Sequence, residues 1–569
     1  MKIEVGLNLK AVVALLLTMI IFCGNFAVSR TITDSSDTVY TQIICSNGNI
    51  YPATAANLQT AIYAVDNSTD GTIGWVDGAG INISISNSIK VTNNIELRNL
   101  KLYVASSTNK TAIVNYYYGS EGTGTNYHIY IHDVYIDGNG ANQPEWNGAS
   151  GWAMENLPNA IYIEYCNNVT IENIEMFDMA SGGIFVERGK NIIIDKIKGY
   201  DIGALYKNSG HGYDDWYAVG VWLYNCSGAT ISNVIMNNTY AGGIAIESHI
   251  SAPERFADHD VVVSNCFVSD SQWGYYTEDC TDVLFSNCIA NDCVDNQISA
   301  VSRTGFLITD NSHRISLVNC EARYSYYGFF VDGDYCQLTN CISKDSSSHG
   351  FYIKQPFAVL TNCQSYSDAG CGFRVAAYNA SLTGCSVISS GVQSIYIKHS
   401  TDGTKNGYTL ISGCIIYGSS NYGIDSYASN VSIVNNILRN CAYGISFATS
   451  GTAQNITCIN NQIINTVMNY PIIVKNTKRG IISNNYINWC GAQSSTAINL
   501  TVCENISVTG NVIQGKAGYY PRFGIKEFTS GNYNFIVFNK GIDISTLTTI
   551  IGTNSKVNFT GIDNWNWDV

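Results

Sequence analysis

Four acidic residues occupy the same place in a short recurring pattern. Glycine, an apolar residue, a variable residue and usually a second apolar residue precede Glu187, Glu247, Glu278 and Asp332. Because this alternation is typical of a strand, the second and fourth residues face inward and the third and fifth face outward. Paired carboxylates on one face are the usual acid and base of glycosidic bond cleavage. We expect Glu247 and Glu278 to form such a pair, with a raised pKa for at least one of them.

The third position of the same pattern is predominantly aromatic. Exposed aromatic rings offer flat faces on which sugar rings stack. A substrate-binding column is therefore predicted, comprising Glu187, Trp222, Tyr276, Phe330, Asp332 and Tyr352.

Farther along the chain, this outward column becomes basic at Lys354, Arg374 and Lys398. Positive charge there suits a substrate that contains uronic acids. The alternative is an ordinary solvated strand face, on which the aromatic side chains pack laterally for stability.

Inserted stretches adjoin the strands that carry these columns. They comprise residues 199–219, 248–260 and 302–314. Loops on a rigid scaffold commonly hold binding residues, so we expect His211, Asp215 and Arg303 to join the carboxylate pair in a walled groove. In a hydrolase one carboxyl group donates a proton while the other is ionised. In a lyase, Arg303 or a histidine abstracts the proton alpha to a uronate carboxylate.

The expected site requires no cofactor, and we predict no metal ligands. Asp258 and Asp260 nevertheless offer oxygen atoms of the kind that calcium prefers.

These columns depend on a repeat of about 22 residues. Asn340-Cys341 returns as Asn362-Cys363, and the interval between such pairs is mostly 21 to 26 residues. Fixed self-similarity of this length predicts a stacked array of short parallel strands. Asn suits the turns, because it tolerates a left-handed backbone.

The repeat should place cysteines above one another along the axis. The expected column comprises Cys266, Cys288, Cys320, Cys341 and Cys363. Parallel neighbours point alongside each other, so buried thiols are favoured over disulfides, although disulfides remain an alternative.

The stretch "NAIYIEYCNNVTIENIEMFDMASGGIFVERGKNIIIDKI" (Asn159 to Ile197) resembles the right-handed parallel β-helix repeat of the pectate-lyase-like superfamily. Asn57 to Gly80 looks like the capping helix and first strands of that family. The resemblance implies an all-β, right-handed parallel β-helix solenoid with a short N-terminal capping helix. This fold serves lyases, hydrolases, epimerases, phage spikes and inert surface proteins, so it implies no single activity.

The expected organisation has four parts: a signal peptide (1–29), a cap with the first strands (30–80), the β-helix (81–545) and a C-terminal tail or cap (546–569). The first part has two lysines before a short apolar run, which is typical of secretion. An uncleaved anchor is the alternative. A secreted or cell-surface protein without a membrane span after cleavage is therefore predicted.

The formal net charge of −14 argues against a nucleic-acid partner, because phosphates require a concentrated basic surface. The expected partner is a polysaccharide or a cell-surface glycan. Two functions fit these features: a polysaccharide lyase or glycoside hydrolase, or a noncatalytic glycan-binding adhesin or surface-layer protein. The sequence leaves the oligomeric state open.

Overall fold

The computed structural model describes most of the chain after residue 41. The described residues are 42–66, 72–115, 126–143, 158–203, 218–248, 259–293, 303–398, 407–468, 470–488, 495–515, 523–528, 533–537, 539–542, 544, 546–549 and 555–558. Residues 42–569 form one compact unit, and the account below concerns that unit.

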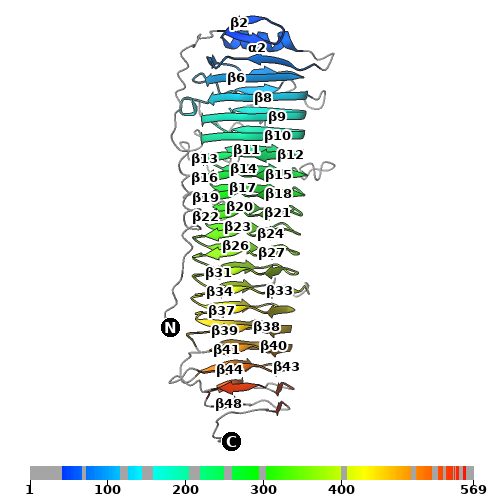
Figure 1. Cartoon of the computed structure of the whole chain (residues 1–569), viewed down its shortest axis with the longest axis vertical. Coiled ribbons are helices and arrows are strands. Elements are labelled where there is room, and N and C mark those ends of the chain that lie inside the picture. The colour runs from blue at the N-terminus through cyan, green and yellow to red at the C-terminus, as the bar shows by residue number, and fades with distance from the viewer. Residues whose placement is uncertain are drawn as a thin grey trace, which may run out of the picture. The chain divides into compact units, whose positions relative to one another are not determined.

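Each turn of the fold contributes three short strands. In one coil these are β14 (Gly242–Glu247), β15 (Val261–Ser264) and β16 (Phe267–Ser269), and each pairs in parallel with the corresponding strand of the next coil. The coils stack in chain order, as Figure 1 shows. This pairing confirms the predicted parallel β-helix.

Three faces result from this stacking. The first sheet contains β5 (Ile89–Val91), β7 (Ile113–Asn115), β11 (Val219–Tyr224), β14, β17 (Trp273–Glu278), β20 (Thr304–Ile308), β23 (Tyr327–Val331), β26 (His349–Ile353), β29 (Phe373–Val375), β32 (Ile395–Ile397), β35 (Tyr422–Ser426), β42 (Thr496–Thr501), β45 (Phe523–Phe528) and β48 (Thr546–Thr549).

The second sheet contains β3 (Gly74–Asp77), β12 (Ser227–Ser232), β15, β18 (Val283–Ser286), β21 (Ser316–Val318), β24 (Gln337–Thr339), β27 (Val359–Thr361), β30 (Ser381–Thr383), β33 (Thr409–Ser412), β36 (Val431–Val434), β43 (Glu504–Thr509), β46 (Phe535–Val537) and β49 (Lys556–Asn558). β48 pairs in parallel with β45, and β49 pairs in parallel with β46, so the ladder continues past residue 545.

The third sheet contains β4 (Asn82–Ile85), β13 (Ile235–Thr239), β16, β19 (Ile289–Asn291), β22 (Glu321–Arg323), β25 (Ile342–Lys344), β28 (Gln364–Tyr366), β31 (Ser386–Ile388), β34 (Ile415–Tyr417), β37 (Ile437–Arg439), β39 (Gln462–Ile464), β41 (Tyr486–Asn488), β44 (Val512–Gln514) and β47 (Lys540–Ile542).

Longer strands bend from one sheet into another. These are β6 (Ile95–Val104), β8 (Asn126–Asp137), β9 (Ile161–Met179), β10 (Ile184–Ile202), β38 (Tyr443–Ile459) and β40 (Ile472–Ser483). β9 and β10 pair from Ile161 with Ile184 through Met179 with Ile202. Left-handed residues such as Asn168 allow the bends in these strands.

The N-terminal part of the unit differs from the repeats. Helix α2 (Ala55–Val65) begins after Thr54, whose hydroxyl accepts a hydrogen bond from the Asn57 N–H. The helix lies within the region where the capping helix was predicted. β1 (Gln42–Cys45) runs antiparallel to β2 (Ile50–Pro52) and to β3. A short 3-10 helix, η1, spans Gly140–Asn142. Among the described residues, no helix is long and apolar enough to cross a membrane.

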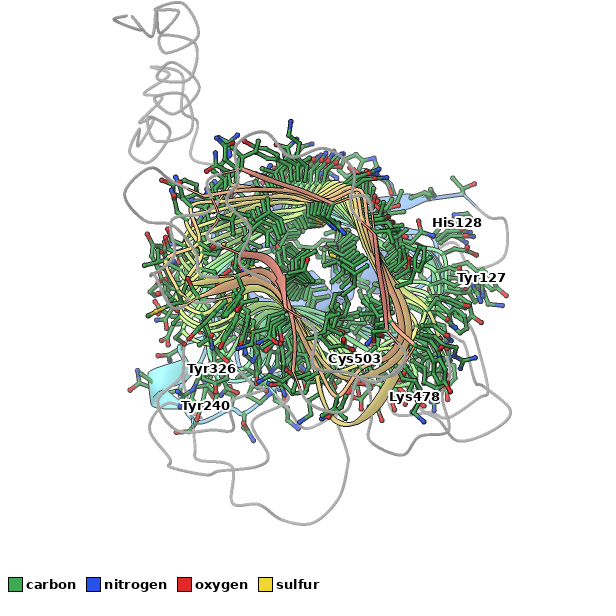
Figure 2. All side chains as sticks on the ribbon, turned by 90° about the horizontal axis from the view of Figure 1, so that it is seen from below. Tyr127, His128, Tyr240, Tyr326, Lys478 and Cys503 are labelled. Atoms are coloured by element: carbon green, nitrogen blue, oxygen red, sulfur yellow. The ribbon has the colours of Figure 1, made fainter. Side chains whose placement is uncertain are left out.

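The repeat pattern places identical side chains above one another inside the coils. Viewed along the stack, side chains fill the interior while others project outward (Figure 2). The rings of Tyr275, Phe306, Phe329, Phe351 and Phe373 form one interior stack, with successive centroids 4.6 to 4.9 Å apart. Such stacking adds to the burial energy of each ring.

The glycine of the recurring pattern is required by the spacing of the coils. A Cβ atom on Gly328 would lie 2.7 Å from the Gly350 carbonyl oxygen, and one on Gly305 would lie 2.8 Å from the Gly328 carbonyl oxygen. Both distances are shorter than real Cβ contacts, so the next coil excludes a side chain there.

The predicted cysteine column is present. Its five members are buried, and all 17 described cysteines are free thiols, which supports the preferred interpretation over disulfides. Cys385 and Cys414 extend the column. Asn436 and Asn461 then occupy it, and the amide of Asn436 donates to the Asn461 side-chain oxygen at 3.0 Å.

One inserted stretch was interpreted wrongly from the sequence. Residues 302–314 were expected to form a loop, but β20 lies within them and pairs with β17 and β23. Gly305-Phe306-Leu307-Ile308 is another copy of the recurring pattern. This copy was overlooked because the interval between Asn287 and Asn319, 32 residues, is longer than the usual period and suggested an inserted loop.

Candidate active site

The structure brings the predicted carboxylate pair together. Glu247 ends β14 and Glu278 ends β17, and the two residues occupy paired positions on these neighbouring parallel strands. Their backbones are therefore one strand spacing apart, about 4.8 Å. Both side chains project outward from the first sheet and are partly buried. The alternation of the recurring pattern fixes this common direction.

The environment keeps one of these carboxyl groups protonated. Burial and the neighbouring Glu278 and Asp279 raise the pKa of Glu247 to about 8, while a hydrogen bond from Trp222 acts in the opposite direction. This agrees with the predicted raised pKa. At neutral pH, Glu247 is a proton donor, as a general acid must be.

Tyr276 orients the second carboxylate. Its hydroxyl donates a hydrogen bond to Glu278 on the same strand. Burial, followed by the charge of Glu278, raises the pKa of Tyr276, so its hydroxyl remains a donor. The position that we predicted to bind substrate therefore supports Glu278 from the side.

The aromatic column is buried, which contradicts its predicted exposure. Trp222, Tyr276 and Phe330 are only 5%, 3% and 6% exposed. Phe185 stacks on Trp222 with ring centroids 4.6 Å apart. Since successive coils are close, neighbouring rings cover each other and form an apolar cluster outside the main core. These three rings therefore pack laterally, as the alternative interpretation of the sequence proposed. Tyr352 differs from them because it is only partly buried.

Glu187 lies apart from the central pair. It is 8% exposed and accepts a hydrogen bond from the Tyr162 hydroxyl at 2.7 Å. Arg188 lies 3.4 Å from Glu187 and 3.7 Å from Glu164. Tyr224 occupies the paired position between Glu187 and Glu247. Glu187 therefore belongs to a separate ion-pair group.

Asp332 and Lys354, both predicted to bind substrate, bind each other. Lys354 forms an ion pair with Asp332, and Gln355 donates to the same carboxylate at 3.0 Å. The Lys354 ammonium also lies 5.1 Å from the centre of the Phe330 ring. Their charges are thus largely neutralised within the protein.

The remaining predicted residues are divided. Arg303 directly precedes β20, whose first residue pairs with Trp273 at the start of β17. Glu278 is at the other end of β17, roughly 16 Å away along the strand. The structure therefore does not bring Arg303 to the carboxylate pair. His211 and Asp215 lie outside the described residues. Asp258, which was suggested as a calcium ligand, also lies outside them.

The basic end of the column has a different arrangement. Arg374 lies over the Tyr352 ring, 4.5 Å from its centroid, and Lys398 is exposed. Sequence reasoning missed Tyr327 and His349, which occupy paired positions one residue before the glycine of the pattern. The available signal was the period itself, since both residues directly precede the glycine in successive copies of the pattern.

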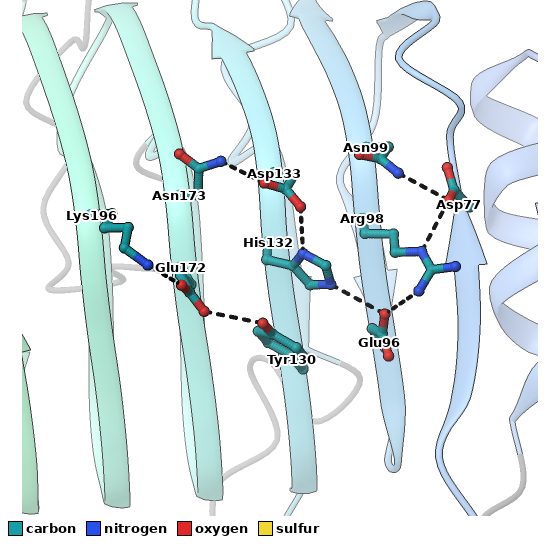
Figure 3. Close-up of polar contacts among 10 residues, drawn as sticks. All are labelled: Asp77, Glu96, Arg98, Asn99, Tyr130, His132, Asp133, Glu172, Asn173 and Lys196. Carbon is teal, nitrogen blue, oxygen red and sulfur yellow. Dashed lines mark hydrogen bonds and ion pairs between the residues drawn. The ribbon is translucent and has the colours of Figure 1, made fainter.

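A second polar group lies on the second sheet, where β3, β6, β8, β9 and β10 run side by side (Figure 3). Arg98 contacts Asp77 at 3.0 Å and Glu96 at 2.6 Å, and His132 contacts Glu96 at 3.2 Å. These charges satisfy one another between coils, as a stabilising network does. Among the described residues, no group of three His, Cys, Asp or Glu side chains is arranged to hold a metal ion.

No protein-family model matches the sequence, and a comparison with curated proteins finds no relative. Solved structures do show similarity. The bacteriophage Phi29 gene product 12 N-terminal fragment shares 15% identity, with 90% of this chain and 94% of that chain covered and a TM-score of 0.46.

Two further solved structures are also similar. Polygalacturonase from Erwinia carotovora ssp. carotovora has 11% identity, coverage of 66% and 93%, and a TM-score of 0.33. A Streptococcus pneumoniae surface protein and adhesin has 12% identity, coverage of 89% and 99%, and a TM-score of 0.31. The parallel pairing of successive coils itself shows that the chain is a parallel β-helix protein.

Proposed function

We propose that this protein is a glycoside hydrolase acting on a polysaccharide, with Glu247 and Glu278 as its catalytic pair. The observation that carries the proposal is their paired position on adjacent strands, where the two carboxyl groups have different surroundings. Glu247 holds a proton, whereas Glu278 accepts a hydrogen bond from Tyr276. Two carboxyl groups whose environments separate their roles are the requirement for glycoside hydrolysis.

The spacing favours a retaining reaction. Carboxyl groups about 5 Å apart suit a covalent route, whereas about 6.5 to 9.5 Å leaves room for a water molecule in an inverting one. The backbones of Glu247 and Glu278 are about 4.8 Å apart, and side chains that run alongside each other from paired positions are expected to keep their carboxyl groups near the first separation. The Glu278 carboxylate attacks the anomeric carbon, and the Glu247 proton passes to the leaving oxygen as the glycosidic bond breaks. Water then cleaves the glycosyl ester, and Glu247 accepts its proton.

Hydrolysis is preferred here over elimination. A lyase needs a base at the carbon alpha to a uronate carboxylate, and Arg303 or a histidine was the predicted candidate. The place of Arg303 at the far end of the strands separates it from the carboxylate pair, and His211 lies outside the described residues. We also propose that the protein is secreted or displayed at the cell surface, because its first residues have the pattern of a signal peptide. No cofactor takes part in this scheme.

The proposal is tested by measuring reducing ends released from uronate-containing and neutral polysaccharides. We expect the wild type to cleave one of them, and Glu247→Gln and Glu278→Gln each to lower turnover by about 10² to 10⁴-fold. Glu504→Gln is the control, because Glu504 lies on the second sheet, its side chain is 38% exposed, and it forms an ion pair with Lys478 at 3.3 Å. Binding without any cleavage would favour the noncatalytic adhesin instead.

A further inference from the structure

Arg374, on β29 of the first sheet, has no acidic partner among the described residues. Within the described ranges, no carboxylate lies at ion-pair distance from Arg374, and its Nε atom is buried without a hydrogen-bond partner. Lys354, one coil earlier, is already paired with Asp332. In a chain with a net charge of −14, an unpaired and partly buried guanidinium is unusual. Burying such a group is costly unless an anion joins it.

Aromatic side chains hold Arg374 in place of an acid. Its guanidinium lies 4.5 Å from the Tyr352 ring centroid, and its Nη1 atom lies 3.0 Å from His349 Nε2. The Cys371 backbone N–H donates to His349 Nδ1 at 3.0 Å, so neutral His349 carries its proton on Nε2, and His349 and Arg374 face each other as two hydrogen-bond donors. Tyr327 completes the group, with its ring centroid 5.8 Å from those of His349 and Tyr352. These side chains come from the three successive strands β23, β26 and β29.

The neighbouring His349 carries no positive charge of its own at physiological pH. Burial, followed by the charge of Arg374, lowers the pKa of His349 to about 4, so the imidazole is neutral at physiological pH. The positive charge is therefore concentrated on Arg374, whose planar guanidinium suits two-point contact with a carboxylate or a sulfate.

We propose that Arg374, with His349, Tyr327 and Tyr352, forms a subsite for an anionic group of a glycan, either a uronate carboxylate or a sulfate ester. This inference specifies an anionic glycan as the substrate, and it rests on the proposed glycoside hydrolase function. β14, β17, β20, β23, β26 and β29 are consecutive in the first sheet. Five strand spacings therefore separate Glu247 from Arg374, roughly 24 Å. A glycan chain lying across the strands reaches both.

The experiment titrates three hexasaccharides calorimetrically: an oligogalacturonate, its methyl ester and a sulfated galactan oligomer. We expect the wild type to bind one of the two anionic probes, and Arg374→Gln to weaken that binding about tenfold or more, as loss of a charge-assisted pair should. Arg374→Lys should recover part of the affinity. The control is Arg439→Gln, which removes an exposed positive charge from the third sheet.

The outcomes separate this site from the catalytic proposal. Arg374→Gln should weaken binding of the anionic probe whether or not any glycan is turned over, and Arg439→Gln should bind it as the wild type does. Unchanged affinity in a folded Arg374→Gln variant, equal binding of the methyl ester, or no binding of either anionic probe would overturn the subsite. Thermal unfolding of each variant verifies that it is folded.

Discussion

The chemistry of Glu247 depends on what surrounds a single side chain. The glutamate is partly buried, and Glu278 and Asp279 add negative charge beside it, so its ionised form is disfavoured. Tyr276 instead gives Glu278 a hydrogen-bond donor. Two residues of the same type, one coil apart, thus have different surroundings.

This difference makes stability depend on pH. The pKa of Glu247 is about 8 in the folded protein against 4.5 for an unperturbed glutamate, so the folded state binds more protons between these values. The contribution of protonated Glu247 to the free energy of unfolding is complete below pH 4.5 and is lost as the pH rises toward 8. Relative to the wild type, Glu247→Gln should therefore gain stability on the order of a few kcal/mol between about pH 5 and pH 9.

Urea unfolding of both proteins across this pH range measures the gain. The Glu504→Gln variant, at an exposed ion pair, should show no comparable trend. A difference between Glu247→Gln and the wild type that stays constant with pH would show that Glu247 has an ordinary pKa.

At the scale of the element, one column of side chains changes its chemistry along the stack. Val234 occupies the column before Cys266, and the cysteines give way to asparagines after Cys414. In the cysteine part, the buried thiols fill space and make only weak hydrogen bonds to carbonyl groups, as Cys341 does to the Leu317 carbonyl at 3.4 Å. In the asparagine part, each amide links adjacent coils, as Asn461 does to the Asn485 side chain at 3.0 Å.

The same substitution should therefore have unequal effects in the two parts. Cys341→Val should cost less than about 1.5 kcal/mol, because one buried apolar group replaces another. Asn461→Val should cost more, about 3 kcal/mol or above, because it removes the acceptor of the Asn436 backbone N–H, one acceptor of the Asn436 side-chain amide and a donor to the Ile433 carbonyl. Denaturant midpoints of the two variants provide the comparison, and equal losses would show that the amide ladder contributes nothing beyond packing.

At the scale of the molecule, repetition made much of the architecture predictable. The 22-residue period and the alternation of apolar residues suffice for parallel coils, for the cysteine column and for the adjacency of Glu247 and Glu278. These features depend on local pattern, which recurs in every coil. Exposure is different, because it depends on what neighbouring coils place against a side chain.

Two errors follow from that limit. The ring of Trp222 faces outward as expected, yet Phe185 from the previous coil covers it. Lys354 also faces outward, but Asp332 neutralises it across one strand spacing. Direction can be inferred from a single repeat, whereas burial and pairing require the register of two.

The pH dependence of glycan cleavage tests the central claim most directly. If Glu247 is the general acid, the turnover rate of the wild type should fall as the pH rises through about 8, where its carboxyl group loses the proton. Glu247→Gln should have little activity and lack this alkaline limb. A wild-type rate that stays level through that range, or a Glu247→Gln variant with the wild-type profile, would contradict the assignment of Glu247 and Glu278 as the catalytic pair.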